Sequence, residues 1–172
     1  NENGIDLENG DNRTAFYYES GKIDEVKMSA TFQNVKEETI YGIYGWFEDS
    51  DNYLLVEASA QGFTITNHFQ GEIQSETYPL PSGASFTSGS KEMSVEIQND
   101  NVLVTWYGLK IVKAGQFYIQ GHDKTKSPYI GVTVRKTPIT VSGIKVTGFN
   151  SYNDIVKGDW ILRGAHTYTW DY

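Results

Sequence analysis

Hydrophobic and polar residues alternate along most of the chain, with the period of two that is typical of β-strands. The clearest stretch begins at Val26, where Val26, Met28, Ala30 and Phe32 alternate with Lys, Ser, Thr and Gln. Such alternation places one face of a strand in a hydrophobic core and the other in solvent. The pattern therefore predicts a strand from Val26 to Gln33.

Several further short strands are predicted, separated by residues that favour turns. Asp49-Ser50-Asp51-Asn52 and Asn99-Asp100-Asn101 each join two strands as a hairpin, while prolines and glycines predict a long loop over residues 71–90. The other predicted strands cover residues 40–48, 53–59, 62–69, 93–97, 102–106, 109–112, 116–120, 129–134 and 139–146.

The predicted fold class is all-β. Apolar residues nowhere keep the spacing of an amphipathic helix for more than about two turns. Many short strands with turns between them predict an antiparallel two-sheet β-sandwich of the jelly-roll type. We expect residues 1–172 to form one such domain, in which the Trp- and Tyr-rich tail, residues 152–172, adds edge strands.

Composition narrows the class of partner. Aromatic residues make up 14 % of the chain, more than a core of this size needs, and the formal net charge is −8 with the basic residues scattered. Nucleic acid and anionic membranes attract clustered Lys and Arg, so a neutral partner is favoured. Neither a membrane span nor a signal-peptide core is present in the sequence, and the Asn, Ser, Thr, Gly and Tyr content favours a secreted or extracellular protein. We expect a mature or excised fragment.

Three stretches resemble the concanavalin A-like (laminin-G-like) sandwiches, especially the carbohydrate-binding modules of bacterial glycan-degrading enzymes. They are residues 41–57 with their Asn52-Tyr53 turn, residues 106–120 with the sequence Trp106-Tyr107-Gly108-Leu109-Lys110, and residues 141–149. The resemblance implies the same sandwich and a sugar ligand. The chain departs from the family at Lys113-Ala114-Gly115, where an acidic Asp-Gly hairpin is usual, and the identity of the sugar stays open.

The first candidate sugar site lies on the strand predicted over residues 40–48. Sugars are bound by a flat aromatic ring below and polar groups at the edge. Strict alternation places Tyr44, Trp46 and Glu48 on one face, opposite Ile43, Gly45 and Phe47. If the second set is core, the first faces solvent; with the faces swapped, Tyr44 and Trp46 are core aromatics instead.

Residues of other strands extend the candidate set. Tyr53 and Glu57 share one face of the next strand and join the same patch if the register allows it. Tyr118 and Gln120 form a second polar-aromatic stripe, for which an ordinary solvated sheet face is the alternative. Trp106 is expected in the core.

An acidic turn is the candidate metal site. Asp49, Asp51 and Asn52 gather oxygen ligands next to Glu48, as in structural calcium sites, although their spacing does not match an EF-hand loop. The alternative is a solvated turn. We expect no other cofactor.

Catalytic motifs are missing from the sequence. Glycosidases of this fold need paired carboxylates about 5 Å apart, and no Glu-x-Asp-x-Glu strand occurs. Residues 113–120 somewhat resemble a segment of jelly-roll alginate lyases, with Tyr118, His122 and Arg135 as the groups that β-elimination needs. The Arg-x-Glu partner of that family is not found in the sequence, so no catalytic residue is assigned.

The sequence favours a non-catalytic carbohydrate-binding module whose partner is a poly- or oligosaccharide. Such a module would attach an appended catalytic domain of a secreted parent protein to a glycan. A polysaccharide (uronate) lyase and a cell-surface adhesin domain are the alternatives, because a sandwich fold alone does not decide function.

Overall fold

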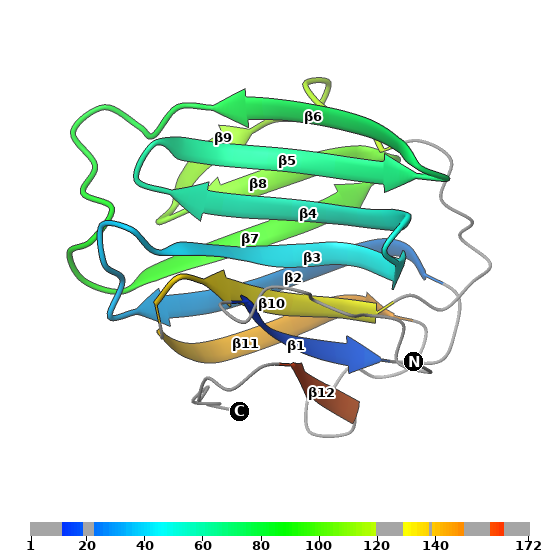
Figure 1. Ribbon diagram of the computed structural model, residues 1–172. Coiled ribbons are helices and arrows are strands. Elements are labelled where there is room, and N and C mark those ends of the chain that lie inside the picture. The colour runs from blue at the N-terminus through cyan, green and yellow to red at the C-terminus, as the bar shows by residue number, and fades with distance from the viewer. Residues whose placement is uncertain (1–11, 19–22, 120–128, 138, 150–158, 164–172) are drawn as a thin grey trace.

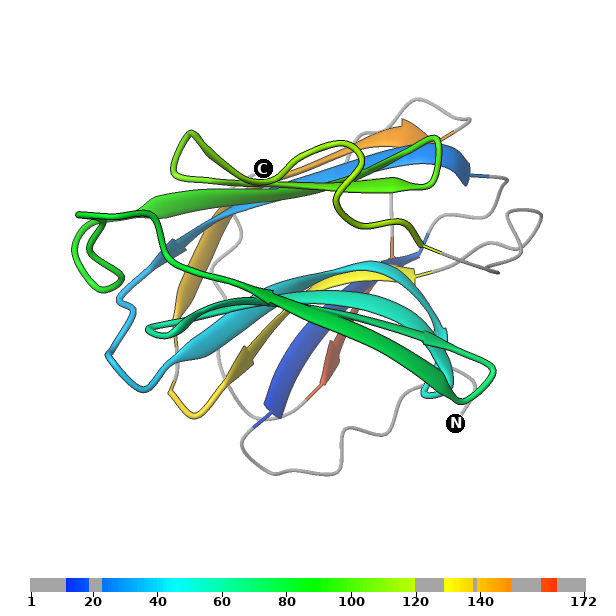
Figure 2. The same cartoon turned by 90° about the horizontal axis from the view of Figure 1, so that it is seen from above.

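The computed structural model describes residues 12–18, 23–119, 129–137, 139–149 and 159–163, which form two stacked antiparallel sheets (Figure 1, Figure 2). The seven-stranded sheet contains, from edge to edge, β12 (Asp159–Arg163), β1 (Asn12–Tyr18), β10 (Tyr129–Arg135), β3 (Ile40–Asp49), β4 (Asn52–Ser59), β5 (Gly62–Phe69) and β6 (Glu72–Tyr78). The five-stranded sheet contains β11 (Thr140–Phe149), β2 (Ile23–Gln33), β7 (Lys91–Gln98), β8 (Asn101–Trp106) and β9 (Leu109–Val112). The fold is therefore an all-β sandwich of the jelly-roll type, as predicted, and no helix long and apolar enough to cross a membrane occurs among these residues.

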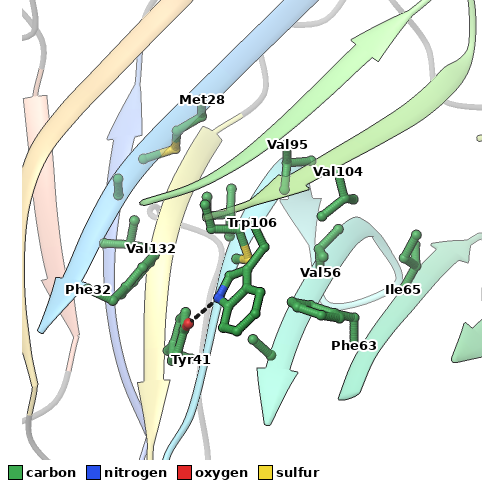
Figure 3. Packing of buried hydrophobic residues seen from close by; sticks show 14 of the residues in the cluster. Met28, Phe32, Tyr41, Val56, Phe63, Ile65, Val95, Val104, Trp106 and Val132 are labelled. Atoms are coloured by element: carbon green, nitrogen blue, oxygen red, sulfur yellow. Dashed lines mark hydrogen bonds between the residues drawn. The ribbon is translucent and has the colours of Figure 1, made fainter. Parts of the chain in front are cut away.

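Apolar residues from the facing sides of both sheets fill the space between them. Trp106 lies at the centre of this core, where its indole Nε1 donates a hydrogen bond to the hydroxyl of Tyr41 at 2.8 Å (Figure 3). Phe63 of β5 packs edge-on against Trp106, and Phe32 of β2 stacks on Tyr41. The core placement predicted for Trp106 is confirmed, and its polar atom is satisfied, as burial requires.

Most of the predicted strands are confirmed, because alternation survives wherever one face of a strand is buried. In β8 every second side chain is buried, and in β7 Met93, Val95 and Ile97 all point into the core. The two predicted hairpin turns join β3 to β4 and β7 to β8. The tail supplies β12, an edge strand of the seven-stranded sheet.

Three sequence-based assignments differ from the structure. The predicted loop over residues 71–90 contains β6, an edge strand whose residues are mostly exposed and so show little hydrophobic pattern. Of the strand predicted over residues 116–120, residues 116–119 are described and form no strand, since only Tyr118 makes an isolated bridge, to Asn101. Strand β1, paired between β10 and β12, was not predicted.

Strand β3 is bent by irregularities in its pairing with β4, one between Tyr44 and Trp46 and another between Phe47 and Asp49. An extra residue on one strand increases local twist and bending. In Figure 2 the middle of β3 and β4 arches towards the five-stranded sheet. The outer face of the seven-stranded sheet is therefore concave at this point.

Candidate functional site

A row of five residues crosses the outer face of the seven-stranded sheet. The strand pairing places Tyr129, Phe47, Tyr53, His68 and Ile73 side by side on β10, β3, β4, β5 and β6. Phe47 is buried in a small cluster that is separate from the main core and against which Tyr53 and Tyr129 pack. The outer face thus has its own aromatic layer.

The rings of this layer are in direct contact. Tyr53 stacks on the imidazole of His68 with ring centroids 4.5 Å apart and an angle of 15° between the planes. Tyr44 meets Tyr53 edge-on at 5.6 Å, and Phe47 lies 6.0 Å from Tyr53 on another side. Tyr53 is half-buried and in contact with three other rings, so its orientation is fixed by packing rather than by solvent.

A charged pair lies on the same face. The guanidinium of Arg135 donates two hydrogen bonds to Glu57, from Nε to Oε2 at 2.9 Å and from Nη2 to Oε1 at 3.2 Å. The two side chains are 34 % and 17 % exposed, so the pair is accessible from solvent. Fork-like pairing of this kind holds both groups in one orientation and leaves further hydrogen-bonding capacity at each.

Glycine at position 42 allows the charged pair to form across strand β3. Gly42 is paired with Glu57, and Arg135 reaches Glu57 from β10 on the far side of β3. A β-carbon at Gly42 would lie 2.3 Å from the carbonyl oxygen of Val56 and 3.1 Å from the side chain of Glu57. Any larger residue would therefore force the β3 and β4 backbones apart at Val56 and Glu57, and would shift the residue that holds Arg135.

Tyr44 links the charged pair to the aromatic layer. Burial raises the pKa of its phenol, the neighbouring Tyr53 and Glu57 raise the pKa further, and Arg135 partly opposes them. Burial and Glu57 also raise the pKa of Tyr53. Both phenols hence keep their protons at neutral pH and can donate hydrogen bonds.

Together these residues make a surface suited to hydroxyl-rich ligands, which we call the outer-face cluster: Tyr44, Tyr53, Glu57, His68 and Arg135. It combines acceptor oxygens, guanidinium and phenol donors, and stacked rings. Within the described residues there is no group of three His, Cys, Asp or Glu side chains arranged to hold a metal ion.

Tyr44 lies on the outer side of β3, as predicted, but it is buried at 6 % exposure rather than solvent-facing, and the face predicted for Trp46 is wrong. The bulge at Gly45 turns both Gly45 and Trp46 inwards, and Phe47, predicted to be core, turns outwards instead. Trp46 is 2 % exposed in the main core, and its Nε1 donates to Glu48 Oε1 at 3.0 Å. Trp46 and Glu48 therefore do not share the outer face with Tyr44, whereas Tyr53 and Glu57 do.

The acidic turn is organised by its own hydrogen bonds. Asp49 Oδ1 accepts from the backbone NH of Asp51 at 2.8 Å and from Asn52 Nδ2 at 2.9 Å, while Asn52 Oδ1 accepts from the NH of Gln70 at 3.0 Å. The bond between Asn52 and Gln70 ties the β3–β4 turn to the β5–β6 turn. Calcium at this turn stays a prediction, which melting curves with and without EDTA would test.

Of the second predicted stripe, only Tyr118 can be placed, on the side of the five-stranded sheet. Tyr118 is 48 % exposed and is bridged to Asn101 of the five-stranded sheet, whereas Gln120 lies outside the described residues. The lyase alternative grouped Tyr118 with Arg135 and His122. Tyr118 and Arg135 lie on different sheets, and His122 is also outside the described residues.

Sequence reasoning missed Arg135 and His68 as members of the site. The alternation of Thr64, Thr66 and His68 with buried Phe63 and Ile65 already places His68 on the polar face of its strand. Arg135 could not be found from alternation, because alternation fixes the face of a residue but not the register between strands.

Comparisons with known proteins show the fold. No family model matches the sequence, and no curated protein matches it. Among solved structures, sheep galectin-11, in complex with glycerol, has a TM-score of 0.59 at 8 % identity, covering 77 % of this chain and 96 % of its own. Xenopus laevis galectin-Ib has a TM-score of 0.55 at 11 % identity, covering 77 % and 98 %. The carbohydrate-binding module CBM66 from Bacillus subtilis has a TM-score of 0.47 at 12 % identity, covering 74 % and 81 %. The two galectins show that the chain has a galectin-like β-sandwich fold.

Proposed function

We propose that the protein binds carbohydrate, without catalysis, on the concave outer face of the seven-stranded sheet. The observation that carries the proposal is the fixed Arg135–Glu57 pair next to the stacked rings of Tyr53 and His68. The similarity of the fold to galectins supports it, and the sheep galectin was solved with glycerol, a small polyol.

The two halves of the outer-face cluster have different roles in binding. Glu57 accepts hydrogen bonds from one or two sugar hydroxyls, and Arg135 donates to a ring or hydroxyl oxygen of the sugar. The pair thereby selects the orientation of the sugar. The Tyr53 ring packs against the apolar C–H face of the sugar. Since each protein–sugar hydrogen bond replaces one with water, we expect an affinity in the micromolar to millimolar range.

We further propose that the domain serves a secreted parent protein by tethering an appended enzyme to a glycan. The sequence composition and the resemblance to carbohydrate-binding modules of bacterial enzymes support this. Neighbouring coding sequence tests it: a fused hydrolase fits the tethering role, whereas a wall anchor or an array of similar sandwiches fits a cell-surface adhesin.

A glycan array of plant, microbial and host saccharides, followed by calorimetry on each hit, tests the binding proposal. We expect at least one neutral glycan to bind, and Arg135→Ala and Tyr53→Ala each to weaken it about tenfold or more, because each removes a contact to the ligand. The matched control is Ile73→Ala, which removes a side chain on the same face that is 64 % exposed and lies one strand beyond His68.

Either of two results overturns the proposal. One is an array and calorimetry series in which no glycan binds to folded wild-type protein. The other is a bound glycan whose affinity is the same in the wild type, Arg135→Ala and Tyr53→Ala, which would move the site away from the outer-face cluster.

A further inference from the structure

A hollow lies on the outer face of the five-stranded sheet, on the opposite side of the sandwich from the outer-face cluster. It has a volume of about 460 Å³. Small-molecule sites usually enclose about 300–1,000 Å³, with an apolar lining and a few placed polar groups. The lining residues are Glu96 of β7, Leu103 and Thr105 of β8, Lys110 and Val112 of β9, and Lys113 and Ala114 of the turn that follows.

The strand register explains how the hollow is built. Glu96 pairs with Leu103 and Thr105 pairs with Lys110, and the register between β8 and β9 shifts between Val104 and Thr105. The alternate residues of β7 and β8 point into the core, so these side chains point outwards. The irregular edge of the sheet thus opens a space between outward-facing polar groups.

The turn after β9 closes one side of this space. The NH of Lys113 donates to Gln116 Oε1 at 2.6 Å, and the NH of Gly115 donates to Asn101 Oδ1 at 2.7 Å. Gly115 has a φ of 90°, a conformation that a residue with a side chain rarely adopts. This turn, which is tied to the beginning of β8, holds Lys113 and Ala114 beside Lys110.

The charged side chains around the hollow are basic on one side and acidic on the other. Lys110 and Lys113 lie on one side, and neither has an ion pair within the part of the chain that the structure describes. Glu96 lies on the other side, again without an ion pair there. In a protein with a formal net charge of −8, two adjacent lysines that no carboxylate neutralises are a local site for an anion.

We propose that this hollow is a second ligand site, which takes a small hydroxylated carboxylate of the hexuronate kind. The carboxylate binds between Lys110 and Lys113, the hydroxyls bind Glu96 and Thr105, and the apolar face of the ligand lies on Leu103. Glu96 repels a second acidic group, so a dianionic molecule binds less well. A neutral molecule also binds less well, because it lacks the carboxylate that pairs with the lysines. The site is independent of the outer-face cluster, which lies on the other sheet.

Titration of ¹⁵N-labelled protein with three sodium salts or sugars tests the proposal. Glucuronate has both carboxylate and hydroxyls, acetate has only the carboxylate, and glucose only the hydroxyls. We expect glucuronate to shift the amide resonances of residues 103–114 and to bind about tenfold more tightly than either of the other two, because it alone makes both kinds of hydrogen bond. A uronate polymer compared with free glucuronate shows whether chain ends or interior units fit.

The variant Lys110→Gln/Lys113→Gln should weaken glucuronate binding about tenfold or more, because charge-assisted hydrogen bonds are the stronger kind. Its melting temperature should stay close to that of the wild type, since both side chains are exposed. Lys36→Gln, an exposed lysine in the β2–β3 connection, is the matched control and should bind normally. The proposal is overturned if glucuronate shifts no resonances of residues 103–114, if acetate binds equally well, which indicates an adventitious ion only, or if the double variant binds like the wild type.

Discussion

Individual aromatic residues of this protein divide into core and surface sets that the sequence does not distinguish. Trp46 illustrates this, because it lies in the core although strict alternation predicts an exposed position. We predict that Trp46→Ala costs about 3–5 kcal/mol of unfolding free energy, the range for truncating a buried aromatic. Chemical denaturation measures it, with Ile73→Ala as an exposed control that should change stability by about 0.5 kcal/mol or less. A Trp46→Ala protein of wild-type stability would contradict the core placement.

Tyr41 makes the stability of the protein sensitive to alkaline pH. Burial raises its pKa from 10.0 to about 12, although the hydrogen bond with Trp106 partly opposes the shift. Because the folded state holds this proton more tightly, the contribution is complete below pH 10 and is lost as the pH rises from 10 to about 12. A shift of this size corresponds to roughly 3 kcal/mol. Tyr44, whose pKa is also raised, adds a loss of the same sign.

Urea unfolding between pH 8 and pH 12 tests this dependence. Tyr41→Phe should be less stable at pH 8, because Trp106 Nε1 loses its acceptor, yet it should lose less stability between pH 10 and 12 than the wild type. Tyr118→Phe alters an exposed tyrosine and should follow the wild-type curve. Equal slopes in the wild type and Tyr41→Phe would rule out Tyr41 as the source.

At the scale of elements, the bulge in β3 decides which residues form the site. A β-carbon at Gly45 would lie 3.2 Å from Val95 and 3.4 Å from Leu54, inside the core. We predict that Gly45→Ala changes stability by about 1 kcal/mol or less, whereas Gly45→Val costs about 1–3 kcal/mol through overpacking. Thermal unfolding of the two variants checks the series. If both are tolerated equally, Gly45 does not point into the core.

The same bulge shows how far the sequence predicts the structure. Alternation predicted β2, β4, β5, β7 and β8 because each has one buried face. It failed at β6, whose exposed residues have no such face, and at Trp46, because an extra residue reverses the pattern for everything after it. Tyr44, Tyr53 and Glu57 were correctly placed on one face, but Arg135 required the register of β10 beside β3.

At the scale of the whole molecule, the two proposed sites lie on opposite faces of the sandwich and differ in charge. The outer-face cluster has a neutralised Arg135–Glu57 pair, whereas Lys110 and Lys113 have no carboxylate partner among the described residues. We predict that raising NaCl from about 0.05 to 0.5 M weakens glucuronate binding several-fold, because salt screens exposed charges, and leaves binding of a neutral glycan almost unchanged. Calorimetry at both salt concentrations measures this, and equal salt dependence for the two ligands would contradict the assignment of charge.

Binding of a neutral glycan at the outer-face cluster can be tested by chemical-shift titration. The glycan selected by the array is titrated into ¹⁵N-labelled protein. We expect the amide shifts to concentrate on β3, β4, β5 and β10, around Glu57, His68 and Arg135, and to require about tenfold more glycan, or above, in Arg135→Ala. Shifts confined to the five-stranded sheet, or shifts around Glu57 that persist unchanged in Arg135→Ala, would contradict it.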